Sequence, residues 1–411
     1  PQVKKLLDIA RRLEGISRHT SVHAAGVVIA PSAITDYAPL YVGSNDEVVT
    51  QWAMKEIERM GLLKMDFLGL STLTLITDCL AEIKRTTGEV IDLASLAMDD
   101  TKTYQLFANG QTLGVFQFES SGMRETLRKA KPQRFDDLIA LNALYRPGPL
   151  KGGVVDDFIN RRLGKKAIDY ELPQLEPILQ DTYGVIAYQE QVMRCARDIG
   201  GFTMGEADLL RKAMGKKSAE VMKAQRERFM NGARGKGINE KKAEKIFDLM
   251  EFFAGYGFNK SHSTTYALLA YHTGYLKANY PRHFMAALLT IESEKADKLA
   301  MYLGECRELG VPVLPPDVNE SQPWFSVSPD GVRFGLNAIK NVGVSAVQSV
   351  LQVRQDKGRI ESVFTLCEDV DLRLVNKRVI ESLAKSGALD SVGPPTDLWA
   401  QLAAASKRAR F

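Results

Sequence analysis

Hydrophobic positions recur at helical spacing along most of the chain, and strand-like alternation is confined to a few short stretches. Strand patterns predict β-structure at residues 24–30, 48–52 and 62–69, each bounded by glycine, proline or polar turn residues. From residue 71 onward the pattern is mainly helical. The sequence therefore predicts a multidomain, mainly α fold with a small α/β part at its start.

Local signals refine this helical pattern. Ser71 is a candidate N-cap of a long helix, and Thr203 and Glu206 have the spacing of a capping box. Between the helices, residues 113–117 are predicted to form a short strand. Residues 324–334 are typical of a β-hairpin on a Pro-Asp-Gly turn.

We expect four parts along the chain. A proline-rich connector at residues 312–316 is the strongest boundary signal after the α/β part. The first two are an α/β part at residues 1–70 and a helical part at residues 71–290. They are followed by a connector with the β-hairpin and a second hairpin motif at residues 291–395, and by a basic helical tail at residues 396–411.

Composition narrows the class of protein. The 411 residues are 45% hydrophobic and 25% charged, which is ordinary for a globular protein. No apolar run approaches the roughly 18 residues of a membrane span and no signal peptide opens the chain, so we expect a cytoplasmic protein without a membrane segment. The four cysteines are widely spaced, which favours reduced core thiols. Because the chain opens on proline inside a helical pattern, we interpret it as a fragment of something longer.

A donor-rich stretch at residues 253–266 is the first candidate for chemistry. Two glycines flank Tyr256, and Ser261 and His262 precede an apolar helical run that stops at Pro281. Unpaired N–H groups and the macrodipole at a helix start favour an anion, and interleaved aromatic rings suit a planar, charged ligand such as a nucleotide. An ordinary capped helix with a polar loop is the alternative.

A lysine and a carboxylate share one side of the strand predicted at residues 62–69. Period-2 alternation places Lys64 and Asp66 together, and such a pair amid apolar residues is costly unless it is paired or functional. The other side of the strand then holds Leu63, Met65 and Phe67. A structural ion pair on a sheet is the alternative to a catalytic role.

Basic side chains are concentrated between residues 204 and 245, which hold 12 Lys and Arg against six Asp and Glu. Arg211 and Lys212 diverge by about 100° on a helix, so they suit separate oxygens of one polyphosphate. A solvated helix face is the alternative. The net charge of the whole chain, +4, is uninformative by comparison.

Residues 336–346 have the form of a helix-hairpin-helix. In such a motif the turn and the start of the next helix present backbone N–H groups to a phosphate without reading base sequence. The candidate DNA-binding residues are Lys340, Asn341, Gly343 and Ser345. A similar pattern at residues 383–389 is a candidate degenerate second copy. A helical turn without function is the alternative for each.

Other chemistries lack their motifs. Residues 214–218 are the segment most similar to a Walker A loop, but they lack the upstream glycine of that motif and its final pair of residues. His19 and His23 have metal-ligand spacing without a third cysteine or histidine ligand close by. Phosphate binding by cations and helix ends is what the motifs favour, together with one carboxylate on a strand.

Taken together, the motifs resemble those of the alpha subunit of bacterial DNA polymerase III, a C-family replicative polymerase. The matching stretches are Ser17–Gly26, Lys64–Gly69, Gly114–Gln117, Tyr145–Pro149, Leu210–Lys217 and Gly257–Ser263. The resemblance implies the remainder of a polymerase-beta-like nucleotidyltransferase palm, helical fingers, and a helix-hairpin-helix module that holds duplex DNA.

The resemblance also implies roles for the candidate residues. Family polymerases hold two Mg²⁺ ions with three palm aspartates, and Asp66 matches the third of these. Lys64 would lie beside the phosphates of the incoming deoxynucleoside triphosphate. From the fingers, Arg211, Lys212, Ser261 and His262 would contact the triphosphate, and Tyr256 would shape the pocket. Many relatives have a second arginine where this chain has Lys212, which keeps the charge but loses the bidentate fork.

The family's first two aspartates are expected upstream of Pro1, together with its N-terminal domain, most of the palm and the thumb. One carboxylate cannot hold two metal ions, so we predict that this chain is inactive alone. The implied partners are primer-template DNA, deoxynucleoside triphosphates and, in the full-length protein, the sliding clamp and other replisome subunits. A non-catalytic module that grips the nucleic-acid backbone is the alternative function.

Overall fold

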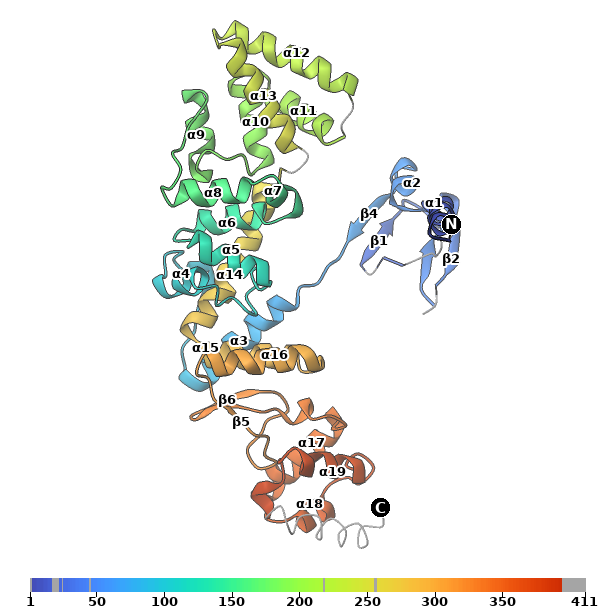
Figure 1. Cartoon of the computed structure of the whole chain (residues 1–411). Coiled ribbons are helices and arrows are strands. Elements are labelled where there is room, and N and C mark those ends of the chain that lie inside the picture. Colours follow the sequence, from blue (N-terminus) through green and yellow to red (C-terminus); the bar gives the residue numbers. More distant parts are fainter. Residues whose placement is uncertain are drawn as a thin grey trace. The chain divides into compact units, whose positions relative to one another are not determined.

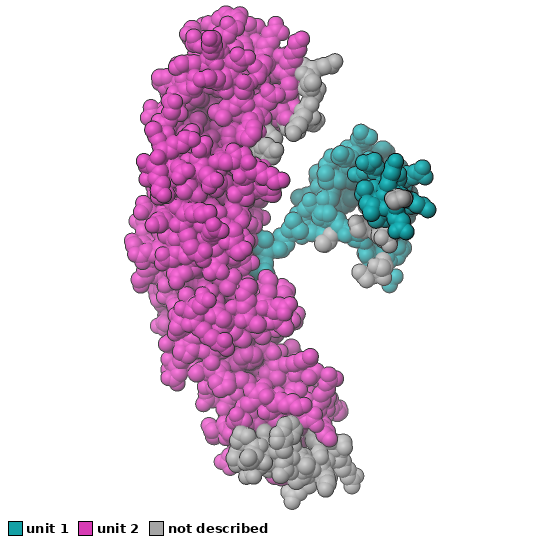
Figure 2. Space-filling model, in the orientation of Figure 1, with its two compact units in different colours: residues 1–71 teal, residues 72–411 magenta. Residues whose placement is uncertain are grey.

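The computed structural model describes residues 2–16, 22–23, 25–43, 46–216, 219–254 and 257–393. The chain divides into two compact units, residues 1–71 and residues 72–411 (Figure 2). The mainly helical, multidomain class expected from the sequence is confirmed, with only small sheets among the described residues. Tyr256 and the tail predicted at residues 396–411 lie outside the described residues.

The first unit contains two antiparallel two-stranded ladders. β1 (Gly26–Ile29) pairs with β4 (Leu63–Asp66), and β2 (Leu40–Val42) pairs with β3 (Val48–Thr50). Its helical elements are α1 (Gln2–Leu13), the 3-10 turn η1 (Ile34–Asp36) and α2 (Met54–Arg59). The three predicted strands are confirmed. β2 is an addition, since three residues are too few to show an alternating pattern.

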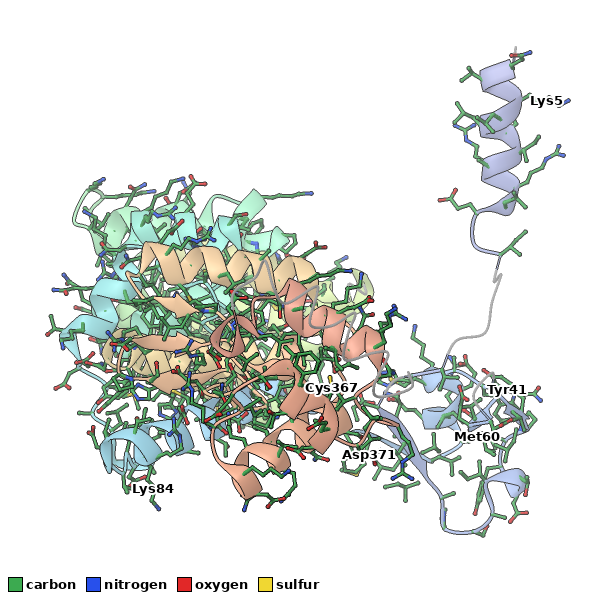
Figure 3. All side chains as sticks on the ribbon, turned by 90° about the horizontal axis from the view of Figure 1, so that it is seen from below. Lys5, Tyr41, Met60, Lys84, Cys367 and Asp371 are labelled. Atoms are coloured by element: carbon green, nitrogen blue, oxygen red, sulfur yellow. The ribbon has the colours of Figure 1, made fainter. Side chains whose placement is uncertain are left out.

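The core of the first unit is small. Ala38, Ile57 and Leu62 are its buried apolar residues. The apolar side of β4 is not part of this core: Leu63, Met65 and Phe67 are 57%, 43% and 64% exposed. α1 also has no buried residue, and its side chains stand out around the helix (Figure 3). The ladder that carries β4 is thus covered on one side only.

The second unit is a succession of helices with one small sheet. Its helices are α3 (Ser71–Thr87), α4 (Thr101–Ala108), α5 (Ser121–Ala130), α6 (Phe135–Leu144), α7 (Pro147–Lys151), α8 (Val154–Arg162), α9 (Glu176–Leu179), α10 (Gln189–Asp198), α11 (Met204–Lys216), α12 (Ala219–Gly235), α13 (Glu240–Ala254), α14 (Lys260–Asn279), α15 (Pro281–Ile291), α16 (Ala296–Glu308), α17 (Val344–Lys357), α18 (Val363–Asp369) and α19 (Lys377–Lys385). Its 3-10 turns are η2 (Leu93–Ser95), η3 (Pro173–Leu175), η4 (Gln180–Thr182), η5 (Leu336–Ala338) and η6 (Asp390–Val392).

The sheet of the second unit has the strand order β5-β7-β6. β6 (Ser326–Ser328) and β7 (Gly331–Arg333) form the predicted hairpin, and β5 (Val313–Leu314) runs parallel to β7. The proline-rich connector is therefore partly a strand of this sheet. None of the helices that the structure describes is long and apolar enough to cross a membrane.

α14 organises the helical part, where it packs against α4, α6 and α15 (Figure 1). It ends before Pro281, as the sequence predicted; Asn259 caps its start, and Pro281 begins the next helix. Gly274 allows a close approach, because a Cβ there would lie 2.8 Å from a ring carbon of Phe107. Tyr271 and Lys277 of α14 are fully buried.

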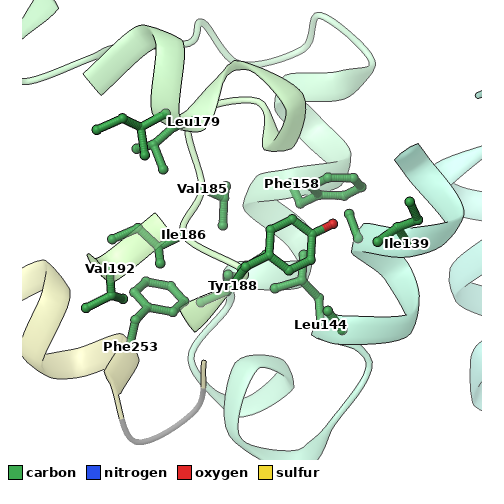
Figure 4. Packing of buried hydrophobic residues seen from close by; sticks show 14 of the residues in the cluster. Ile139, Leu144, Phe158, Leu179, Val185, Ile186, Tyr188, Val192 and Phe253 are labelled. Atoms are coloured by element: carbon green, nitrogen blue, oxygen red, sulfur yellow. The ribbon is translucent and has the colours of Figure 1, made fainter. Parts of the chain in front are cut away.

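Buried apolar side chains form three clusters in this unit. The largest lies within residues 104–271, and Figure 4 shows part of it around Tyr188 and Phe158. A second joins α3, α14, α15 and α16 to β6 and β7, so the boundary predicted at 290/291 falls inside it. The third, within residues 318–392, contains Cys367 (Figure 3). All four cysteines are free and buried, and burial raises the pKa of Cys79 and Cys195 to about 12.

The strand predicted at residues 113–117 is wrong, because this segment forms consecutive turns. Gly114 has φ +78°, and a Cβ there would lie 2.5 Å from Leu288. The Thr112 hydroxyl donates to the Phe118 carbonyl at 2.7 Å and closes the loop. A left-handed glycine and a side-chain-closed loop are incompatible with an extended strand.

Candidate nucleotide and nucleic-acid site

β4 carries Lys64 and Asp66 side by side, as the strand pattern predicted. Lys64 Nζ donates to Asp66 Oδ1 at 2.5 Å. The lysine side chain is 15% exposed and the aspartate side chain 44%. In the antiparallel register, Gly26 lies opposite Asp66 and Val28 opposite Lys64. The ammonium group is therefore largely covered, whereas the carboxylate opens to solvent.

His23 is a further neighbour of this pair. Its Nδ1 lies 3.8 Å from Asp66 Oδ1 and accepts a hydrogen bond from the Ala25 N–H at 3.2 Å. Gly26 permits the arrangement, because a Cβ there would lie 2.9 Å from both His23 Nδ1 and Lys64 Cε. His23 thus neighbours a carboxylate, while His19 lies outside the described residues.

The environment of Asp66 favours its ionised form. The hydrogen bond from Lys64, followed by the charges of Lys64 and His23, holds the pKa of Asp66 below its ordinary value. Asp66 therefore presents an anionic carboxylate to solvent at neutral pH. This is the kind of oxygen ligand that a hard divalent cation prefers.

α11 begins with the predicted capping box. The Thr203 N–H donates to Glu206 Oε2 at 2.9 Å, and the Glu206 N–H donates to Thr203 Oγ1 at 3.3 Å. Because the cap fixes the start of the helix, it also fixes the direction of Arg211 and Lys212 two turns later.

A single acid holds both of these cations. Arg211 Nη2 donates to Asp208 Oδ1 at 2.8 Å, and Lys212 Nζ lies 2.8 Å from Asp208 Oδ2. Hydrogen bonds from Lys212 and Arg211 lower the pKa of Asp208. The Arg211 side chain is 24% exposed and that of Lys212 is 57%. The two residues are therefore not equivalent: Arg211 is anchored in the protein and Lys212 extends into solvent.

Gln189 connects Arg211 to the segment that precedes α14. Its Oε1 accepts from Arg211 Nη1 at 3.3 Å, and its Nε2 donates to the Gly257 carbonyl at 3.1 Å. Its backbone N–H donates to the Phe258 carbonyl at 2.9 Å. The structure thus brings together the basic helix and the donor-rich stretch, which are about 45 residues apart in the sequence.

Side chains of the protein accept hydrogen bonds from the N–H groups at the start of α14. Asn259 Oδ1 accepts from the His262 N–H at 2.8 Å, and Glu190 Oε2 accepts from the Lys260 N–H at 3.0 Å. Glu190 Oε1 also accepts from Asn259 Nδ2 at 3.0 Å. Because these donors are already satisfied, the expected attraction of this helix start for an anion does not come from the Lys260 and His262 amides. The side chains of this helix start are the other candidate donors.

Of those side chains, Ser261 and His262 are exposed and Ser263 is buried. His262 stacks on Tyr266 at 4.2 Å between ring centroids and meets the edge of Phe258 at 5.3 Å. The Arg146 guanidinium lies 4.6 Å from the Phe258 centroid on the far end of this stack.

The stack continues to the turn at residues 113–117. Tyr266 contacts Phe116 at 5.1 Å between ring centroids, and the Phe116 N–H donates to Thr273 Oγ1 of α14 at 3.2 Å. Three segments that are distant in sequence therefore hold the His262 ring in one orientation. Phe258 contacts both the His262 ring and the Arg146 guanidinium.

The predicted helix-hairpin-helix is only partly formed. Its first arm is the 3-10 turn η5 and not a full helix. The Leu336 and Asn337 N–H groups at its start donate to the carbonyls of Gln322 and Pro323. The second arm is α17, whose N-cap is Gly343. The four candidate residues, Lys340, Asn341, Gly343 and Ser345, are all exposed at this turn.

Three family models match parts of the chain. Residues 1–69 match the bacterial DNA polymerase III alpha NTPase domain, and residues 72–237 match the bacterial DNA polymerase III alpha subunit finger domain. Residues 310–397 match a helix-hairpin-helix motif. The DNA polymerase III subunit alpha of Thermus aquaticus is 47% identical over 98% of this chain.

The chain belongs to the bacterial DNA polymerase III alpha subunit family. The subunit of Escherichia coli (strain K12) is 46% identical over 96% of the chain, and that of Aquifex aeolicus is 46% identical over 95%. The chain spans about a third of the length of the curated relatives that it matches: 33%, 35% and 34% for these three.

Within this family framework, the sequence alone did not reveal several residues that hold the site. Asp208, Gln189 and Glu190 fix the candidate cations and the start of α14, and Arg146 ends the aromatic stack. Asp208 was visible on the basic helix at i, i+3 and i, i+4 spacing from the two cations. Gln189, Glu190 and Arg146 act across long sequence separations, for which the sequence offers no local signal.

Proposed function

We propose that this chain is part of a template-directed DNA polymerase that adds deoxynucleoside monophosphates to a primer 3′-hydroxyl during chromosomal replication in the cytoplasm. The observation that carries the proposal is the Lys64–Asp66 pair: an ionised, solvent-open carboxylate fixed on a strand within the segment that matches the NTPase domain. A module that only binds nucleic acid has no use for this arrangement.

The proposed cofactor is a pair of Mg²⁺ ions. When bound, such ions lower the pKa of an attacking hydroxyl and neutralise charge on the phosphates. Asp66 fits as one hard oxygen ligand. Among the residues that the structure describes, no three His, Cys, Asp or Glu side chains come together as a metal site. These residues alone therefore do not hold two ions, and we expect the chain to be inactive by itself.

Lys64 has a proposed double role. While it donates to Asp66, its charge keeps the carboxylate ionised. When the carboxylate is engaged elsewhere, the Lys64 ammonium is available to a phosphate oxygen of the incoming nucleotide. Both roles require Lys64 and Asp66 to lie on the same side of β4.

The fingers residues are proposed to hold the triphosphate. Arg211 and Lys212 would exchange Asp208 for phosphate oxygens, while Ser261 and His262 contribute a hydroxyl and an imidazole. Arg211 offers a planar fork that is already oriented by Gln189. We assign Tyr256 to the same pocket by sequence position alone. The helix-hairpin-helix residues would hold duplex through its backbone, with the sliding clamp and other replisome subunits as further partners of the complete protein.

Primer extension tests the proposal in the complete polypeptide that contains this sequence. Asp66→Asn keeps the shape of the side chain and removes its charge, and we expect extension to fall by at least 100-fold, about 2.7 kcal/mol in transition-state free energy. Asp36→Asn, an exposed aspartate on η1 of the same unit, is the matched control and should retain activity.

Extension by Asp66→Asn within threefold of the unaltered protein would overturn the catalytic assignment. If duplex binding persisted in that case, the alternative of a non-catalytic module that grips the phosphate backbone would be favoured. The chain of residues 1–411 alone should bind duplex without extending a primer. Extension by this chain alone would refute the need for further metal ligands.

A further inference from the structure

We propose that the turn at residues 113–117 positions His262 for the triphosphate of the incoming nucleotide, through the rings of Phe116 and Tyr266. The proposal rests on the triphosphate contact proposed above for His262, and it adds two residues that would not touch the nucleotide themselves. Both are therefore positioning residues. The proposal also gives a role to the Gly114–Gln117 motif, which the proposed function leaves without one.

The turn itself has a fixed backbone. Gln117 adopts the left-handed conformation with φ +62°, as Gly114 does with φ +78°. A residue other than glycine keeps such a conformation only where its surroundings hold it. Here Val115 and Phe118 are fully buried. The direction in which Phe116 leaves the turn is therefore set by the fold of the turn.

Helices α14 and α16 hold the turn from outside. Glu119 Oε2 accepts from the Gly114 N–H at 3.3 Å and from the Tyr302 hydroxyl of α16 at 3.1 Å. The Phe116 N–H donates to Thr273 Oγ1 of α14 at 3.2 Å. These contacts anchor the turn to both helices, so the Phe116 ring has a fixed place beside α14.

Tyr266 lies between this turn and His262. Its ring centroid is 5.1 Å from that of Phe116 and 4.2 Å from that of His262. His262 and Tyr266 are four residues apart on α14, and side chains at this spacing lie on the same face of a helix. The planes of these two rings are inclined by 31°, so they are closer to parallel than to edge-on. Such a stack restricts rotation of the His262 ring.

The stack has a consequence for nucleotide binding. His262 is exposed, whereas Phe116 and Tyr266 are half-buried. An exposed side chain without a stacking neighbour exchanges among rotamers, and a ligand has to order it on binding. The half-buried rings order the exposed one before the nucleotide arrives. This preorganisation favours the bound nucleotide and the transition state alike, so it acts on KM more than on kcat.

Steady-state primer extension by the complete polymerase polypeptide tests the proposal. Tyr266→Leu removes the ring and keeps an apolar side chain. We expect KM for the deoxynucleoside triphosphate to rise by about 3- to 10-fold, as for the loss of one aromatic pair. The value of kcat should change by less than about twofold. Tyr266→Phe keeps the stack and should keep the original KM.

A double-mutant cycle with His262 separates positioning from a purely structural role. If Tyr266 acts through His262, Tyr266→Leu should raise KM in the unaltered polymerase and have no further effect in a His262→Ala background. A general packing defect would raise KM equally in both backgrounds. Phe116→Leu should give the same pattern with a smaller rise, because its ring contacts Tyr266 and acts one step further away.

Tyr275→Leu is the matched control. Tyr275 is a half-buried residue of the same helix, and its ring lies 6.4 Å from that of Tyr280 between centroids. Because this pair is separate from the His262 stack, its loss should leave KM unchanged. Thermal unfolding of each variant, followed by circular dichroism, measures the accompanying loss of stability.

The outcomes distinguish this proposal from the proposed function. If His262→Ala raises KM and Tyr266→Leu does not, the positioning role is overturned and the triphosphate contact of His262 stands. An equal rise for Tyr266→Leu in both backgrounds, or a matching rise for Tyr275→Leu, also overturns the positioning role. If His262→Ala leaves KM within about twofold of the original value, the proposed triphosphate contact itself fails.

Discussion

The two candidate sites for nucleotide chemistry are supported very differently. Asp66 lies on a two-stranded ladder whose outer side is exposed, in a unit with only three buried apolar residues among those described. Arg211 and His262 lie on a helical unit with a large continuous core. A side chain is held only as firmly as the elements beneath it, so the second site is the better organised of the two.

In both sites, however, each cation forms an ion pair with an acidic side chain of the protein. Asp66 binds Lys64, and Asp208 binds both Arg211 and Lys212. Such pairs keep the cations oriented when no phosphate is bound. They also require the acid to be exchanged when a ligand arrives, which couples binding to a local rearrangement.

The largest expected effect would break a buried ion pair near the C-terminal end of α14, the helix whose start carries His262. Lys277 Nζ donates to Glu305 Oε1 at 2.5 Å and to the Gln111 and Leu113 carbonyls at 2.8 Å each, with both charged side chains buried. Lys277→Met leaves Glu305 uncompensated and should destabilise the second unit by about 3–5 kcal/mol. Hydrogen exchange of the α14 amides measures the loss for that unit alone.

A double variant sharpens this result. Lys277→Met combined with Glu305→Leu removes both charges and should recover most of the lost stability. Lys298→Met removes one of the two lysines that pair with Glu292, and because the Lys298 side chain is 40% exposed and Lys295 remains, the change should cost less than about 1 kcal/mol. Equal losses for Lys277→Met and Lys298→Met would mean that the buried pair does not support the helical unit.

The next effect tests the difference between Arg211, which is anchored in the protein, and Lys212, which extends into solvent. In the complete polymerase polypeptide, Arg211→Ala should lower kcat/KM for nucleotide by about 10- to 100-fold, because it removes a charge-assisted hydrogen bond worth about 1.5–3 kcal/mol. Lys212→Ala should lower it by only about threefold, since a solvent-exposed charge contributes less than about 1 kcal/mol. Steady-state kinetics at fixed primer-template concentration measure both. A matching loss of primer-template affinity would place the residues in the DNA channel instead.

A smaller effect appears in the pH dependence of stability. The Arg228 side chain and the Thr203 cap lower the pKa of Glu206 from 4.5 to about 2. The stabilisation is therefore fully present above pH 4.5 and is lost as the pH falls from 4.5 toward 2. Glu206→Gln should lower Tm at pH 6 and differ progressively less from the unaltered chain at lower pH. A Tm difference that stays constant between pH 6 and pH 3 would contradict this.

The smallest effect concerns the exposed side of β4 in the first unit. Leu63 is more than half exposed on the open side of β4, so Leu63→Ser should change the stability of the first unit by less than about 0.5 kcal/mol. Ile57→Ala in the core of the same unit must cost clearly more. Hydrogen exchange of the β1 and β4 amides measures both. A large loss for Leu63→Ser would show that the open side is covered in solution.

Much of the framework was predictable because it depends on local rules. Strand period 2 placed Lys64 beside Asp66, and the capping box located the start of α11. The strand predicted at residues 113–117 failed for a non-local reason. Its apolar residues pack under α14 and α15, where Gly114 must adopt a left-handed turn beside Leu288. The helix-hairpin-helix is supported by the family model that matches residues 310–397, although its first arm is a 3-10 turn.

What the sequence determined by itself is most of the order of helices and strands, the capping box of α11, the side of β4 that carries the charged pair, and the resemblance to a family. All but the resemblance follow from residues a few positions apart. Only the tertiary structure decided that Glu190 holds the start of α14, and that Gln189 joins α11 to the same segment. The same holds for Asn341 and Ser382, which join two distant turns. These contacts cross long sequence separations, and a hydrogen bond between distant residues leaves no periodic trace in the chain that forms it.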